Sequence, residues 1–228
     1  MEVRRTRAFR RRDVVAVTAG CMLPPSLTAC AARPSASTTF RARFDTVVLP
    51  ERDWFITGGA AGRVRVSHGA AVIEAVPGSP LAIEALFVPR EGDLARGLAA
   101  DERLSWTAQV APQGSFFVIC EAAFGPAPLL LQQTWYGFHV TARDTAGEVR
   151  GSEIAAAEGQ RSGPQRWRLE RQGHSLRLIL GERVLFTGAV PAALTRLAFG
   201  ETRSDEQHGG RLELRDVRYE RQPVTRRG

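Results

Sequence analysis

The sequence contains no lysine and no asparagine, so all 31 of its basic side chains belong to arginine. The codons of both missing residues are rich in adenine, and we attribute the gap to a GC-rich genome rather than to the fold. The sequence also lacks a glycine loop of the kind that cradles phosphate, and it lacks a Ser/His/Asp signature. These absences leave no motif for phosphate transfer or for a serine nucleophile.

Arginine gives the chain a formal net charge of +7, but this charge is unevenly distributed. The first 29 residues hold six arginines against Glu2 and Asp13, a net charge of +4. The remainder holds 25 arginines against 22 acidic residues, with the two signs interspersed. Because nucleic-acid binding needs a basic patch, we expect no nucleic-acid partner.

The N-terminal segment has the composition of an export signal. Arginines between Arg4 and Arg12 precede an apolar run at residues 14–27, which Pro24 and Pro25 interrupt. A membrane-spanning helix needs about 20 apolar residues, so this run is too short to cross a bilayer. We therefore expect residues 1–29 to be a signal peptide.

Two motifs in this segment resemble bacterial export motifs. Leu27-Thr28-Ala29-Cys30 resembles the lipoprotein box, which implies that Cys30 carries lipid on its sulfur and becomes the new N-terminus. Arg11-Arg12-Asp13-Val14-Val15 resembles part of the twin-arginine motif. A plain secretory signal is the alternative; Cys21 fits the box less well, because it lacks the upstream leucine. Residues 30–43 would then tether the domain to the membrane.

Cys120 lies in the strongly apolar stretch 116–120. A thiol in such surroundings is expected to be buried and unreactive. If Cys30 carries lipid, Cys120 has no partner for a disulfide within the mature chain. A Cys30–Cys120 disulfide is the alternative.

Short alternating stretches dominate the rest of the chain. Trp167 and Leu169 alternate with Arg166 and Arg168, and glycine-containing turns separate such stretches. Period-two alternation bounded by glycine predicts antiparallel strands with one buried face. We expect strands at residues 44–49, 63–66, 70–76, 81–88, 104–111, 115–124, 129–143, 166–171, 175–180, 183–187, 196–199 and 211–220.

These strands predict one all-β domain at residues 44–221, followed by a frayed tail at 222–228. Three motifs narrow the fold: the hairpin from Trp167 to Gly181, the strand Leu197-Ala198-Phe199-Gly200, and the closing strand Asp216-Val217-Arg218-Tyr219. Together they resemble the concanavalin A-like lectin and glucanase superfamily. The resemblance implies an antiparallel jelly-roll β-sandwich of two sheets.

Glycoside hydrolases of this superfamily carry catalytic carboxylates on one strand as Glu-x-Asp-x-Glu, where alternation places them on one concave face. The sequence contains no such motif. Glu213 and Asp216 are three residues apart, which predicts opposite sides of a strand, and Glu121 stands alone on its strand. We therefore do not expect a retaining glycosidase. Glu121 and His139 are the acid–base candidates if the chain is an enzyme.

The best candidate for a glycan-binding surface is the strand expected at residues 129–143. Its odd positions supply Gln133, Trp135, His139, Thr141 and Arg143, whereas its even positions, among them Phe138 and Val140, have the character of core. An aromatic ring beside amide, imidazole and guanidinium groups suits a sugar. From neighbouring strands we expect Ser105, Thr107, Gln109 and Glu121 to join this face, with Trp106 pointing inward. The alternative is that Trp135 belongs to the core and the polar groups are merely solvated.

Metal binding has weaker support. The histidines are scattered without metal-ligand spacing: His68, His139, His174 and His208. Glu201, Asp205 and Glu206 offer oxygen ligands for Ca²⁺, which some members of the superfamily bind. We favour the interpretation that these three side chains lie in an ordinary solvated loop, and we predict no cofactor.

The sequence thus predicts a monomeric lipoprotein of the cell envelope whose domain binds a glycan or glycoconjugate. One alternative is a glycoside hydrolase or polysaccharide lyase of the same fold, and the other is a structural or protein-interaction lipoprotein. Clustering of Gln109, Glu121, Trp135, His139 and Arg143 in one concave pocket would favour a sugar site. A flat charged face with a buried Trp135 would favour the last alternative.

Overall fold

The computed structural model describes residues 38–42, 44–59, 61–88, 100–143, 149–155 and 161–223. By its internal contacts the chain divides into two units, Met1–Arg33 and Pro34–Gly228, and all described residues belong to the second. The expectations for Cys21, Cys30 and the export motifs therefore lie outside the described residues. No helix among the described residues is long and apolar enough to cross a membrane.

Eight strands form the first sheet, called sheet A. Their order is β13-β12-β11-β6-β15-β4-β3, and β1 also pairs with β15. The strands are β1 (Thr38–Arg41), β3 (Arg63–Ser67), β4 (Ala70–Ala75), β6 (Ala100–Pro112), β11 (Gln165–Gln172), β12 (Ser175–Leu180), β13 (Arg183–Ala189) and β15 (Gly210–Pro223).

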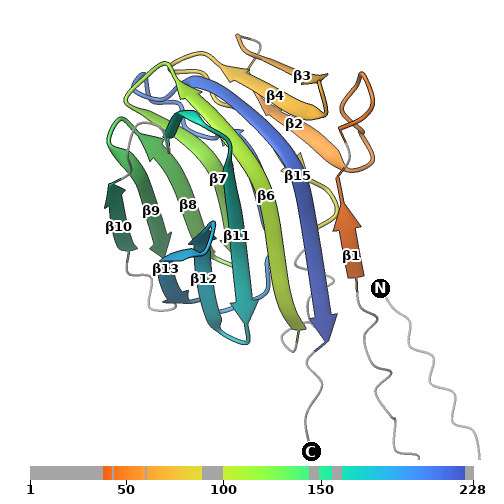
Figure 1. Cartoon of the computed structure of the whole chain (residues 1–228), viewed down its shortest axis with the longest axis vertical. Helices are drawn as coiled ribbons and strands as arrows, with labels where there is room; N and C mark the ends of the chain where they lie inside the picture. The colour runs from red at the N-terminus through yellow and green to blue at the C-terminus, as the bar shows by residue number, and fades with distance from the viewer. Residues whose placement is uncertain are drawn as a thin grey trace, which may run out of the picture. The chain divides into compact units, whose positions relative to one another are not determined.

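Seven strands form the second sheet, called sheet B, in the order β10-β9-β8-β7-β14-β5-β2. They are β2 (Trp54–Gly58), β5 (Leu81–Ala85), β7 (Phe116–Phe124), β8 (Ala127–Thr134), β9 (Gly137–Arg143), β10 (Val149–Ala155) and β14 (Arg196–Glu201). The named strands pair antiparallel in both sheets, and Figure 1 shows their arrangement. The predicted all-β jelly-roll sandwich is confirmed.

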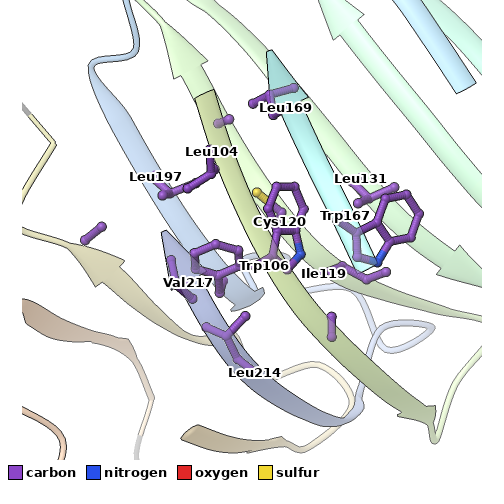
Figure 2. Close-up of a cluster of buried hydrophobic side chains, with 14 of the residues drawn as sticks. Leu104, Trp106, Ile119, Cys120, Leu131, Trp167, Leu169, Leu197, Leu214 and Val217 are labelled. Atoms are coloured by element: carbon purple, nitrogen blue, oxygen red, sulfur yellow. The ribbon is translucent and has the colours of Figure 1, made fainter. Parts of the chain in front are cut away.

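The core lies between the inner faces of the two sheets. Figure 2 shows Trp106 and Trp167 of sheet A in one cluster with Ile119, Cys120 and Leu131 of sheet B. The two indole rings are stacked, with their centroids 6.3 Å apart. Trp167 also meets the ring of Phe138, from sheet B, edge-on at 4.9 Å. The contact between Trp167 and Phe138 joins the two sheets, and the cluster as a whole buries large apolar side chains.

The longest strands, β6 and β15, run side by side through the middle of sheet A. Their register extends from the pair Gly210–Pro112 to the pair Pro223–Ala100, with one irregularity between Arg215 and Arg218. The other edge of β15 pairs with β4 through residues 210–214 and with β1 through residues 218–221. Figure 1 shows β4 and β1 along the two halves of this one strand.

One buried ionic cluster near the C-terminal half of β15 was not expected from the sequence. Glu102 accepts hydrogen bonds from Tyr219 Oη at 2.7 Å and from Arg171 Nε at 2.6 Å. It also accepts the backbone N–H of Leu194 at 3.0 Å. All three side chains are buried, and desolvation raises the pKa of Tyr219 above its usual range. A buried carboxylate with this many donors is satisfied, so the cluster ties β6, β11 and β15 together.

Strand pairing extends beyond the predicted domain at both ends. Part of the expected tether, Thr38–Arg41, forms β1, and Gln222 and Pro223 of the expected tail continue β15. An apolar contact helps to hold β1 in the fold, because the ring of Phe40 stacks on that of Phe87 with centroids 3.7 Å apart. Backbone pairing with the long strand β15 holds the rest of β1 in place.

Trp167→Ala tests the aromatic bridge between the sheets. Removing the indole leaves a cavity beside Trp106 and Phe138, so we expect the free energy of unfolding to fall by about 3–5 kcal/mol. Urea denaturation of the full chain measures this. Val184→Ala is the matched control, because Val184 is 48% exposed on β13; a change of more than about 0.5 kcal/mol there would contradict the assignment of the core.

Candidate functional site

The outer face of sheet B carries polar side chains across neighbouring strands. The strand register aligns Glu84 of β5 with Ala198 of β14, and Ala198 with Glu121 of β7. The same line continues through Leu130 of β8 to Thr141 of β9. Beside it, Gln132 of β8 pairs with His139 of β9. We call the outward polar side chains of these lines, with Arg196, the polar row: Glu84, Glu121, Gln132, His139, Thr141 and Arg196.

Arg196 holds the two carboxylates of the polar row. Its Nε lies 3.0 Å from Glu84 Oε2, and its Nη1 lies 2.8 Å from Glu121 Oε1. Thr202 Oγ1 donates a hydrogen bond of 2.7 Å to the other oxygen of Glu121. Although burial alone would lower it, the hydrogen bonds and charges of the two carboxylates raise the pKa of Arg196. Both carboxylates are therefore ion-paired on this face.

The stretch expected as one strand at residues 129–143 is instead a hairpin. β8 ends at Thr134, β9 begins at Gly137, and Trp135 and Tyr136 form the bend. Across this hairpin an even-numbered residue of β8 pairs with an odd-numbered residue of β9, as Gln132 does with His139. Directly paired residues share a face of the sheet, so the face of the odd-numbered residues changes from β8 to β9. Odd residues of β8 therefore face the core, and odd residues of β9 face outward.

This shift corrects the prediction for two residues. Gln133 points inward, pairs across the strands with Phe117 and Phe138, and is 4% exposed, so it is not on the outer face. Its neighbour Gln132, not singled out in the sequence, takes the outward position. Trp135 is 73% exposed at the bend and packs edge-on against Tyr136, with ring centroids 5.1 Å apart. Trp135 is therefore neither in the core nor on the face of the sheet.

The remaining predicted glycan-binding residues do not all gather on sheet B. Gln109 lies on β6 of sheet A, where its Nε2 donates to the carbonyl of Ser162 at 2.9 Å, so the expected single cluster does not form. His139 lies on the outer face, and a Cβ on neighbouring Gly151 would lie 3.3 Å from its Nε2. Arg143 is the last residue of β9, and its side chain lies outside the described residues. On β6, Trp106 is buried as expected.

The three calcium candidates do not converge. Glu201 is fully buried, and its oxygens accept the backbone N–H of Val118 at 3.0 Å and of Arg203 at 2.8 Å. Asp205 accepts the backbone N–H of Gln207 at 2.8 Å, and Glu206 is exposed. Within the described residues, no group of three or more His, Cys, Asp or Glu side chains could hold a metal ion.

Glu201 has a structural role instead. Its carboxylate lies 3.4 Å from His208 Nδ1, and the His208 ring stacks on Phe116 at 5.4 Å. Desolvation raises the pKa of Glu201, and the backbone hydrogen bonds and His208 oppose that rise. The carboxylate thus fastens the loop after β14 to β7.

Cys120 is a free and fully buried thiol. Burial raises its pKa far above the usual value, and the neighbouring charge of Glu121 adds to the rise. A thiol that stays protonated is a poor nucleophile. The structure confirms the expectation of a buried, inert cysteine.

The outer face of sheet A is a charged surface. Glu170 lies 2.8 Å from Arg168 on its own strand, and 2.7 Å from Arg177 and 3.3 Å from Arg103 on the two neighbouring strands. One expectation on this face is wrong. The irregularity in β15 places Asp216 on the outside while Val217 enters the core, so Glu213 and Asp216 lie on the same face.

Arg196→Gln tests whether the ion pairs organise the polar row. Glu84 and Glu121 then lose a shared partner, and we expect unfolding free energy to fall by about 1 kcal/mol, a modest value because the Arg196 side chain is 40% exposed. Arg52→Gln is the matched control, since Arg52 is 88% exposed beside Asp53. Equal losses in both variants, measured by urea denaturation, would contradict this role.

Comparison with known proteins rests on structure, because no family model and no curated protein matches the sequence. A non-specific endo-β-1,3(4)-glucanase from family GH16 superposes with a TM-score of 0.59 at 14% identity, covering 82% of this chain and 92% of the glucanase. A structure from work on endo-acting O-glycanases of the human gut microbiota, which initiate mucin breakdown, gives 0.60 at 11% identity, covering 82% and 99%. A structure of botulinum neurotoxin type C, a toxin whose cell entry depends on interaction with two ganglioside molecules, gives a TM-score of 0.52 at 6% identity. The match covers 74% of this chain and 43% of the neurotoxin chain. These similarities establish the fold, a jelly-roll β-sandwich of the concanavalin A-like type.

Proposed function

We propose that the domain binds a glycan on the outer face of sheet B. The observation that carries the proposal is the polar row, which crosses five neighbouring strands of a sheet in a fold shared with glucanases and with a ganglioside-dependent toxin. Sheets of this kind present an extended surface on which a chain of sugar rings can lie.

The polar row has the chemistry that sugar hydroxyls require. Each hydroxyl both donates and accepts, so a binding surface needs both kinds of group. His139 and Thr141 supply an imidazole and a hydroxyl, Gln132 adds an amide that is only 8% exposed, and the Arg196 ion pairs supply charged donors and acceptors. Trp135 and Tyr136 stand at the end of the same hairpin and offer aromatic rings for the apolar faces of a sugar.

Binding fits this face better than hydrolysis does. The outward positions of β8 hold Leu130 and Gln132, which cannot act as acid or nucleophile. Glu84 and Glu121 are both ion-paired with the same Arg196, which occupies carboxylate oxygens that a catalytic acid and nucleophile would need.

A carbohydrate-active enzyme is the second candidate function. Two observations favour it: hydrolases recur among the similar structures, and Glu121 faces the same side of sheet B as His139. A glycoside hydrolase or lyase would then use Glu121 and His139 as acid and base. A structural or protein-interaction domain without a sugar site is the third candidate.

Glycan binding is tested by pairing the full chain with three probes: laminarin, mucin and ganglioside-containing vesicles. We expect at least one probe to bind, and His139→Asn to raise the dissociation constant at least tenfold by removing a polar contact. His68→Asn is the matched control, because His68 is exposed in the turn between β3 and β4, which belong to sheet A and not to the sheet that carries the polar row. Calorimetry or sedimentation measures the binding.

The three candidates separate in this experiment. Release of reducing ends from a bound probe, abolished by Glu121→Gln, would establish the enzyme. Binding without release would support the glycan-binding domain. A folded chain that binds none of the probes would leave the protein-interaction domain in the lead.

We further propose that the chain is an exported lipoprotein held in the cell envelope through Cys30. The support is the arginine-rich start, the apolar run and the motif Leu27-Thr28-Ala29-Cys30.

Cys30→Ser tests the lipid anchor. The native chain should incorporate labelled fatty acid and fractionate with membranes, and the variant should do neither, because a hydroxyl does not replace the thiol as the lipidated atom. Mass spectrometry of the N-terminal peptide identifies the modified residue. Cys21→Ser is the control, and loss of label in that variant alone would assign the lipid to Cys21.

A further inference from the structure

A hollow of about 460 Å³ lies on the other side of the sandwich, on the outer face of sheet A. Ser105 and Thr107 of β6 lie in it, with Arg166 and Arg168 of β11 along one side. Glu182, from the turn between β12 and β13, and Asp216 of β15 also line it, together with Trp106, Trp167 and Gly181. The hollow exists because two short hydroxyl side chains stand among long arginines.

Asp216 enters this hollow because β15 carries a β-bulge. Arg215 pairs with Thr107 and Arg218 with Ser105, so β15 contains one residue more than β6 between these two pairs. Val217 fills the core, and Asp216 takes a left-handed backbone conformation with φ of +51°. Bulges change the direction of side chains and are common beside functional sites. Non-glycine residues in the left-handed conformation also cluster at functional sites.

The charges in the hollow differ from those on the rest of sheet A. Elsewhere on this face each glutamate of the strands has an arginine partner, as Glu170, Glu213 and Glu220 show. Within the described part of the chain, Asp216 and Glu182 have no ion-pair partner, and neither does Arg166. The hollow therefore offers acceptors and a donor that the fold itself does not use.

We propose that this hollow is a second carbohydrate site, which takes a neutral sugar unit of a glycan. Sugar hydroxyls would donate to the carboxylates of Asp216 and Glu182 and accept from the Arg166 guanidinium and the hydroxyls of Ser105 and Thr107. An anion would meet two carboxylates, whereas a neutral polyol satisfies both kinds of group. The volume lies within the range of about 300–1,000 Å³ typical of ligand sites.

The proposal takes its ligand class from the proposed function but uses the opposite face. A glycan held on both faces would cross-link two chains or two glycan strands. The two proposals therefore succeed or fail at different residues.

The test is an amide chemical-shift titration of the full chain with two soluble probes, laminaritriose and N-acetyllactosamine. We expect one probe to shift the amide signals of Ser105, Thr107, Gly181 and Asp216. Asp216→Gly should weaken this binding at least tenfold and leave the unfolding midpoint within about 2 °C of the native value, because glycine accepts the left-handed conformation. Glu182→Gln, in an exposed turn, gives a second variant with little risk to folding, and Glu206→Gln removes an exposed carboxylate elsewhere as the control.

Each outcome decides the proposal. Shifts at the hollow that both Asp216→Gly and Glu182→Gln weaken would support it. No shift at the hollow with either probe would overturn it, and so would shifts that persist in both variants. Shifts confined to Gln132, His139 and Thr141 would support the polar row and overturn the hollow, whereas shifts confined to the hollow would do the reverse. A large fall in the unfolding midpoint of Asp216→Gly, with Glu182→Gln binding normally, would make Asp216 a structural residue and overturn the proposal.

Discussion

The antiparallel pairing of β6 with β15 is the constraint on which the rest of the structure depends. These strands place Trp106, Leu214 and Val217 in the core, and the other strands of sheet A assemble outward from them. The same pair carries the buried Glu102–Tyr219 hydrogen bond at one end. At its middle the pair accommodates a bulge, and this irregularity moves Asp216 to the outer surface. One ladder of backbone hydrogen bonds thus determines both a part of the core and a part of the surface.

The two outer faces of the sandwich differ in how they use arginine. On sheet A, guanidinium groups and carboxylates pair both along single strands and between neighbouring strands, so that most charges cancel locally. On sheet B, Arg196 joins two carboxylates, and an amide, an imidazole and a hydroxyl group lie on the next two strands, β8 and β9. A surface of the first kind is well solvated, and its exposed pairs contribute little stability. A surface of the second kind offers mixed donors and acceptors, which is why the glycan proposal places its main site there.

Two local irregularities explain why Gln133 and Asp216 were predicted on the wrong face of their strands. The bend at Trp135-Tyr136 divides an apparently continuous alternating stretch, and it reverses which residues of β8 face the core. The bulge at Asp216 likewise breaks the rule that residues three apart face opposite sides. The bulge contains neither glycine nor proline, the usual marks of a turn, whereas Gly137, directly after the bend, is the one glycine in the stretch 129–143 that could have marked it. Gln132 was missed for the same reason that Gln133 was wrongly placed.

The sequence by itself determined the all-β class, most strands and the buried Cys120. All of these depend on period-two alternation and on the polarity of single residues, which are local properties. Only the tertiary structure decided which residues share a face: it separated Gln109 from Glu121, brought Arg196 between Glu84 and Glu121, and buried Glu201 and Glu102 among their donors. Such groupings depend on strand order and register between segments far apart in the chain, and these follow from packing the two sheets over a common core.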